Sequence, residues 1–230
     1  MIREISPEGS DPSDTADSAQ ARLTVDDPAS VPIRPAVSVL MVRDGENGLE
    51  VFVQHRVSTM DFAAGVVVFP GGRVDPSDET RAASIEVRDP AAHTSAWKNS
   101  SIAEVADGWR ALLAAAVREI EEETGTVLDP SDLKPWANWV TPLGLPKRFD
   151  TYFYLAVVGE IQAPRHQTTE AHTSEWLRVD ELLAEEAAGR LKLMRPTLVL
   201  LGELSTLGGT DELIALERRF DPVSPDFPAS

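Results

Sequence analysis

The first half of the chain alternates short apolar runs with turn-forming residues, a pattern typical of β-strands. The runs PAVSVLMV (35–42) and EVFVQHR (50–56) flank the sequence RDGENG, whose glycines and asparagine favour a hairpin turn. A third run, GVVVFPGG (65–72), ends in a glycine pair, and later apolar runs cover 133–142 and 150–158. We therefore predict strands over these five segments, with the first two joined as a hairpin.

Helical periodicity begins in the middle of the chain and dominates its last third. Apolar residues recur at i, i+3, i+4, i+7 and i+11 from Trp109, which predicts a helix over about 108–124. Asp107 is a candidate N-cap for this helix, and Gly125 suits the position just after its last turn. Further helices are predicted at about 179–189, 195–206 and 211–219. Strands followed by interleaved and trailing helices indicate an α/β (α+β) fold in α/β/α layers.

Three segments stand outside this pattern. Residues 1–30 carry seven acidic residues against two basic ones and show no hydrophobic periodicity, which predicts an acidic, disordered N-terminal arm. Residues 79–107 are polar and weakly periodic, and we interpret them as an insertion. Residues 221–230 form a Pro-rich tail. A single folded domain is therefore expected over residues 31–220.

Composition narrows the classes of function. A net charge of −17 argues against a broad nucleic-acid interface, which needs a basic face. The chain has no cysteine, which excludes disulfides, thiolate metal sites and cysteine nucleophiles. No apolar run approaches the ~20 residues of a membrane span, and the N-terminus lacks the pattern of a secretory signal. We expect a cytoplasmic protein that binds neither nucleic acid nor a membrane.

Glutamates crowd the end of the central helix, in the stretch REIEEETG (118–125). At ~100° per residue, Glu119, Glu122 and Glu123 share an arc of roughly 100° beside the apolar stripe, whereas Glu121 points elsewhere. Such like charges repel each other, and a divalent cation with its preference for oxygen ligands would relieve that repulsion. A cation would also help so acidic a protein to accept an anionic substrate. The alternative interpretation is a solvated acidic face.

The same stretch is similar to the second half of the Nudix box, G-x5-E-x7-R-E-U-x-E-E-x-G-U, where U is a bulky aliphatic residue. The matching residues are Arg118, Glu119, Ile120, Glu122, Glu123 and Gly125, with Thr126 in place of the last aliphatic residue. The first half is displaced: FPGGRVDPSD supplies Gly72 and then Asp78 in place of glutamate, with Glu79 as the next candidate. Between Asp78 and Arg118 lie 39 residues (79–117) instead of seven, an insertion of 32.

An interrupted box of this kind resembles the coenzyme A diphosphatase branch of the Nudix hydrolase superfamily. The branch resemblance continues in WVTPLGLPKRFDTYFYLA (139–156), TEAHTSEWL (169–177) and LKLMRPTLVLL (191–201). Ahead of the box, VFVQHRVSTMDFAAGVVVFPGG is similar to a motif of coenzyme A-cleaving members. It keeps Arg56, Gly65 and the FPGG sequence, and it departs from the motif at Val57 and Asp61.

The resemblance implies a Nudix-type α/β/α sandwich with a mixed sheet, extra C-terminal helices and an insert within the box. It implies metal-dependent hydrolysis of a pyrophosphate bond in a nucleoside diphosphate-linked substrate, with coenzyme A or acyl-coenzyme A expected. Mg2+ or Mn2+ would be held by Glu119, Glu122, Glu123 and the carbonyl oxygen of Gly72, with Arg118 orienting the glutamates. ADP-ribose, NADH or another nucleotide conjugate is the alternative substrate, and a non-catalytic nucleotide sensor is the alternative function.

Several roles stay open at this point. Glu123 and Glu170 are both candidates for the general base. The candidate phosphate-binding residues are Arg56, Arg73, Lys147 and Arg148. Trp97 either packs the insert onto the domain or stacks on an adenine as part of a lid, and Asp150 is expected to pair structurally. The resemblance leaves a homodimer as a candidate assembly.

Overall fold

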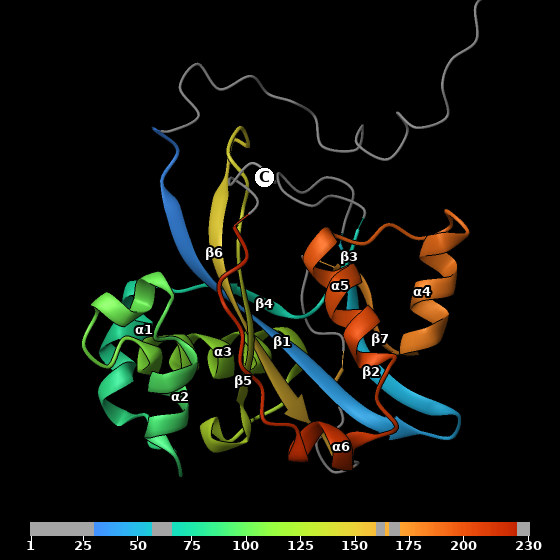
Figure 1. Ribbon diagram of the computed structural model, residues 1–230, viewed down its shortest axis with the longest axis horizontal. Coiled ribbons are helices and arrows are strands. Elements are labelled where there is room, and N and C mark those ends of the chain that lie inside the picture. The colour runs from blue at the N-terminus through green and yellow to red at the C-terminus, as the bar shows by residue number, and fades with distance from the viewer. Residues whose placement is uncertain (1–29, 57–65, 160–163, 166–170, 225–230) are drawn as a thin grey trace, which may run out of the picture.

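The chain folds around one mixed β-sheet (Figure 1). The computed structural model describes residues 30–56, 66–159, 164–165 and 171–224. The sheet runs in the order β3-β2-β1-β6-β5, while β4 pairs with β1 and β7 pairs with β2. The strands are β1 (Ile33–Gly45), β2 (Gly48–Arg56), β3 (Val67–Val68), β4 (Gly71–Arg73), β5 (Lys134–Val140), β6 (Arg148–Val157) and β7 (Ala171–Arg178). β1 lies parallel to β6 and antiparallel to β2, so the sheet is mixed.

Helices cover both faces of the sheet, as Figure 1 shows. They are α1 (Pro76–Arg81), α2 (Pro90–Ala96), α3 (Trp109–Thr124), α4 (Val179–Ala187), α5 (Arg195–Leu204) and α6 (Thr210–Ala215). Successive strand residues point to opposite faces. Val37 and Val39 of β1 therefore pack with α3 and the insert, whereas Leu40 and Val42 pack with α4, α5 and α6. The predicted α/β/α layering is confirmed.

The central helix α3 forms where the apolar periodicity predicts it. The residues of the predicted stripe, Trp109, Leu112, Leu113, Ala116 and Ile120, are all buried. Gly125 ends the helix in the left-handed conformation with a φ of 70°, and its N–H donates to the carbonyl of Glu121. The predicted Asp107 cap is wrong: the N-cap is Gly108, and no side chain caps this end. Asp107 instead adopts a φ of 52° in the preceding turn.

Two other boundaries differ from the prediction for identifiable reasons. The predicted strand 65–72 is split at Pro70, which has no N–H to donate; β3 pairs with β2 and β4 pairs with β1. The last helix ends at Ala215 instead of residue 219. At this end, the amine of Lys134 on β5 donates to the carbonyl oxygens of Leu213 and Ile214. None of the helices in the described part of the chain is long and apolar enough to cross a membrane.

Strand β7 was missed by sequence analysis. Its residues alternate less clearly than those of the other strands, and Glu175 and Thr173 lie among them. It forms because β2 offers a long antiparallel partner, in a register that pairs Phe52 with Trp176. Those two rings lie edge to face with centroids 5.5 Å apart, so tertiary packing outweighs a weak local pattern.

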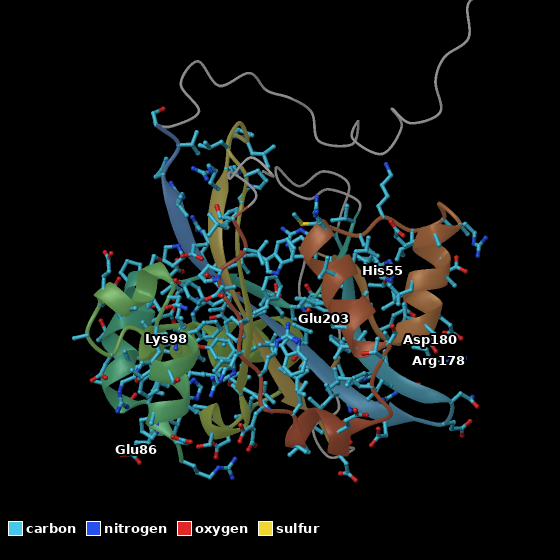
Figure 2. The ribbon with its side chains drawn as sticks, viewed as in Figure 1. His55, Glu86, Lys98, Arg178, Asp180 and Glu203 are labelled. Carbon is cyan, nitrogen blue, oxygen red and sulfur yellow. The ribbon has the colours of Figure 1, made fainter. Side chains whose placement is uncertain are left out.

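The insert forms a compact layer against α3 and β6. Glu86 and Lys98 lie on this layer, and Arg178 and Asp180 lie at α4 on the other side of the molecule (Figure 2). Trp97 is 2% exposed, and its ring lies 5.1 Å from that of Tyr152. The packing role of Trp97 is therefore the one that the structure shows.

A buried carboxylate anchors the same layer to the sheet. Asp150 on β6 accepts hydrogen bonds from Ser101 in the insert (2.6 Å), from Asn138 (2.6 Å) and from Tyr152 (2.9 Å). Three donors compensate for burying this carboxylate. Asp150 thus pairs structurally, as expected from the sequence.

Candidate active site

The glycine pair after Pro70 forms a corner that is pinned to β1. The carbonyl of Pro70 accepts a hydrogen bond from the N–H of Val39 at 2.9 Å. Gly71 has a φ of 149°, and a Cβ at this position would overlap the carbonyl of Val37. Only glycine combines this backbone conformation with so close an approach between two strands. The sequence FPGG therefore builds a rigid corner beside β1.

Glu119 of α3 faces this corner directly. A Cβ at Gly72 would overlap the carboxylate of Glu119, so the absence of a side chain at position 72 makes room for that carboxylate. The Glu119 side chain is 15% exposed and lies 2.9 Å from Nη1 of Arg118. Burial raises the pKa of Glu119, and the charge of Arg118 offsets part of this effect. A bound cation would act in the same direction as Arg118, because it stabilises the charged carboxylate.

Glu123 reaches the same corner one helical turn later. Its Oε2 accepts a hydrogen bond from the backbone N–H of Gly71 at 3.0 Å and another from the Nε2 of Gln54 at 3.1 Å. Glu123 is only 6% exposed and Gln54 only 2% exposed. Gln54 was not among the site residues predicted from the sequence. The available signal was a polar residue facing α3 in the apolar run of β2, two positions after the buried Phe52.

Arg118 connects both halves of the box. Its Nε lies 2.9 Å from Oδ1 of Asp78 and its Nη2 lies 2.8 Å from Oδ2, a two-point ion pair. Its other contacts are the carboxylates of Glu119 and Glu122 and the carbonyl oxygen of Arg73. The hydrogen bonds to Asp78 raise the pKa of Arg118 further above its already high ordinary value. The prediction that Arg118 orients the glutamates is consistent with this arrangement.

Asp78 is the acid that stands in the first half of the box. Its side chain is fully buried, whereas Glu79 is exposed. Burial opposes its ionisation, but hydrogen bonds from Arg118 and from the backbone of Asp75 outweigh that effect and lower its pKa. The structure therefore selects Asp78, and not Glu79, as the partner of Arg118.

The three predicted carboxylate ligands are not equally placed. Glu119 and Glu123 flank the glycine corner, whereas the side chain of Glu122 is 59% exposed and lies 3.1 Å from Arg118. Among the described residues, no three acidic or histidine side chains form a ready-made metal cluster. The donor set nevertheless suits Mg2+ or Mn2+, because it consists of carboxylate oxygens beside the backbone of a glycine pair that carries no side chains. Glu122, whose side chain is largely exposed, stays a predicted ligand.

The predicted phosphate-binding residues lie at different depths. Arg73 is exposed on β4, directly after the corner, and Arg56 is half-buried at the end of β2. Lys147 is exposed just before β6. Arg148 is 6% exposed, and its Nε donates to the carbonyl of Thr141 at 3.0 Å. The predicted acid Glu170 lies outside the described residues.

Comparison with known proteins shows the family of this chain. The family model that describes the NUDIX domain matches residues 32–197. This chain belongs to the NUDIX family. The NUDIX match contains the glycine corner, the insert and the whole of α3. The expected family relationship is therefore confirmed, while the coenzyme A diphosphatase branch stays a proposal.

Two relatives show the extent of the similarity. A protein from Caenorhabditis elegans described as "Putative nudix hydrolase 7" is 28% identical over 173 residues, which are 70% of this NUDIX chain. The match covers 57% of that relative's length, so the chain spans little more than half of it. The crystal structure of a NUDIX hydrolase from Alicyclobacillus acidocaldarius is 26% identical, with a TM-score of 0.69. That match covers 81% of this chain and 97% of the other, and it confirms the mixed α/β Nudix-like fold.

Proposed function

We propose that this NUDIX protein hydrolyses a pyrophosphate bond in a nucleoside diphosphate-linked substrate with the help of Mg2+ or Mn2+. The observation that carries the proposal is the meeting of Glu119 and Glu123 with the Gly71–Gly72 corner. Two carboxylates from one helix approach a backbone bend with no side chains of its own. This arrangement suits a cation and a phosphate better than it suits a solvated acidic face.

The residues at the corner would have different roles in such a reaction. Glu119, Glu122, Glu123 and the carbonyl oxygen of Gly72 would hold the cation. When bound, the cation neutralises phosphate charge and lowers the pKa of a water ligand. Arg118 keeps Glu119 and Glu122 in place through its ion pairs. Phosphoryl transfer asks a protein chiefly for positioning and charge neutralisation, which these groups supply.

The base that takes the proton from the attacking water is either Glu123 or Glu170. Oε2 of Glu123 already accepts two hydrogen bonds, which suits a fixed ligand more than a group that must gain a proton. We therefore favour Glu170 as the base. Replacement of Glu170 by glutamine should then lower kcat without weakening Mn2+ binding, whereas Glu123→Gln should weaken the binding itself.

We further propose coenzyme A or an acyl-coenzyme A as the substrate. This narrower proposal is supported by the interrupted box and by Arg56 ahead of the FPGG sequence. Arg73 is the exposed cation nearest in sequence to the corner, and a guanidinium group there would suit a substrate phosphate. ADP-ribose, NADH and other nucleotide conjugates share the diphosphate and serve as the competing substrates in the test.

The test is incubation of the purified protein with Mg2+ or Mn2+ and coenzyme A, acetyl-coenzyme A, ADP-ribose, NADH or diadenosine polyphosphates, followed by chromatography of the products. Release of 3′,5′-ADP from coenzyme A is the expected result. AMP from NADH or ADP-ribose alone would replace the coenzyme A proposal with the other substrate class. Nucleotide binding without any turnover would overturn the hydrolase proposal in favour of a sensor.

A matched pair of variants links any turnover to the glutamates. Glu122→Gln removes one predicted ligand and should abolish metal-dependent turnover while the protein stays folded. Glu121→Gln makes the same change at the exposed neighbour on another side of α3, and it should leave turnover close to that of the unmodified protein. Equal activity of both variants would remove Glu122 from the ligand set.

A further inference from the structure

Gln54 is an unusual residue for its position. It lies on β2 with Val53 and Phe52 before it, and it is 2% exposed. Alternation along the strand places Gln54 and Phe52 on the face that packs against α3, where the neighbouring side chains are apolar. Burying an amide costs free energy unless the amide is hydrogen-bonded, so a glutamine here needs a hydrogen-bond partner that offsets this cost.

The partner is one oxygen of a predicted metal ligand. The Nε2 of Gln54 donates to Oε2 of Glu123 at 3.1 Å, and the N–H of Gly71 donates to the same oxygen at 3.0 Å. The assignment of the amide nitrogen follows from chemistry, since an ionised carboxylate can only accept. Two donors from two different strands thus fix the orientation of a carboxylate that projects from α3.

We propose that Gln54 is a positioning residue that holds the carboxylate of Glu123 in the orientation needed to bind a divalent cation at the glycine corner. The inference rests on the proposed metal role of Glu123. Hydrogen bonds to a ligating carboxylate set its direction before the cation arrives, and loss of such a partner weakens metal binding. Donors on two different strands fix the direction of the Glu123 carboxylate more firmly than the N–H of Gly71 would without Gln54.

The test measures Mn2+ binding to the protein without substrate, by electron paramagnetic resonance of free Mn2+. Gln54→Met keeps the volume of the side chain and removes the donor. We expect this variant to raise the Kd for Mn2+ about 10-fold or more. Gln54→Asn keeps an amide but shortens the side chain by one methylene group, so it should also raise the Kd for Mn2+. This second variant keeps the test valid if Gln54→Met does not fold.

A matched control separates positioning from general destabilisation. Thr210 lies at the start of α6, on the other face of the sheet, and its buried hydroxyl donates to Asp44 of β1. Thr210→Val removes this hydroxyl. It should lower thermal stability without changing the Kd for Mn2+. Folded Gln54 variants that bind Mn2+ within twofold of the unmodified protein would overturn the proposal.

A double-mutant cycle adds a readout that a merely structural role would not move. Glu123→Gln alone should weaken Mn2+ binding, and adding Gln54→Met to it should weaken binding little further, because Gln54 acts through Glu123. Additive effects of the two substitutions would contradict the positioning role. Absence of Mn2+ binding by the unmodified protein would reject the metal role of Glu123 and this inference with it. Coenzyme A turnover enters none of these measurements, so failure of the substrate proposal would remain distinguishable.

Discussion

Arg118 and Asp78 are 40 positions apart in the sequence and lie against each other as a two-point ion pair, with contacts of 2.9 and 2.8 Å. The pair closes the loop that the insert forms, because Asp78 directly precedes the insert and Arg118 lies on α3 after it. Both side chains are largely or fully withdrawn from water. The interrupted box is thereby reassembled in space around one guanidinium group.

Asp78→Asn should therefore destabilise the protein. The substitution removes the charge that lowers the cost of burying Arg118, although Glu119 and Glu122 still face that guanidinium. We expect a loss of about 1–3 kcal/mol in the free energy of unfolding, measured by urea denaturation. Glu79→Gln, at the exposed next position, is the control and should change it by less than about 0.5 kcal/mol. Equal losses of unfolding free energy at positions 78 and 79 would show that the ion pair between Asp78 and Arg118 does not stabilise the protein.

Gly72→Ala should impair metal-dependent activity without a large loss of stability. The added methyl group would occupy the space of the Glu119 carboxylate and displace it from the corner. If Glu119 holds the cation as proposed, its misplacement by about 1 Å should cost about 100-fold in turnover. The control is Gly202→Ala on α5, where no heavy atom lies near the new methyl group and helix propensity gains up to ~1 kcal/mol. Normal Mn2+ binding and turnover by Gly72→Ala would argue against a close approach of Glu119.

Acid should weaken the folded state through His93 of the insert. Burial lowers the pKa of His93 to about 4 from an ordinary 6.5, and the charge of Asp89 offsets part of that shift. As the pH falls, His93 therefore becomes protonated near pH 6.5 in the unfolded chain but only near pH 4 in the folded protein. The contribution of neutral His93 to the free energy of unfolding is fully present above pH 6.5 and is lost as the pH falls to about 4. It amounts to about 3 kcal/mol in full.

The measurement is the urea unfolding free energy at several pH values between 7 and 4. His93→Phe keeps a ring against Trp109, whose ring lies 5.2 Å from that of His93, and it has no proton to gain. Its stability should fall less steeply with acid than that of the unmodified protein. Carboxylates titrate in both proteins, so the difference between the two curves isolates His93. Parallel curves would show that His93 does not resist protonation.

Lys134→Met should loosen α6 from the sheet. The Nζ of Lys134 lies 3.1 Å from the carbonyl oxygens of Leu213 and Ile214, and it also contacts that of Leu216 at 2.5 Å. These carbonyl groups lack helical partners at the end of α6, so the ammonium group satisfies them. We expect a loss of about 1–2 kcal/mol in unfolding free energy. Lys98→Met, at an exposed position in the insert, should have little effect.

The sequence by itself determined the features that depend on neighbours along the chain. The apolar spacing from Trp109 is local to one helix, and Gly125 ends that helix because glycine adopts the left-handed conformation without steric cost. The clustering of Glu119 and Glu123 near one face follows from the same helical geometry. The layered fold was also predictable, since alternating strands and trailing helices leave few ways to bury their apolar faces.

Only the tertiary structure decided which distant groups meet. Asp78 rather than Glu79 reaches Arg118, and Gln54 reaches Glu123 across 69 positions. Such contacts depend on the register of the sheet and on how α3 lies across it, and a shift of one residue would turn Gln54 to the opposite face. Strand β7 likewise depends on the partner that β2 provides. Local periodicity carries no information on these distances, because they are set by packing between segments far apart in the chain.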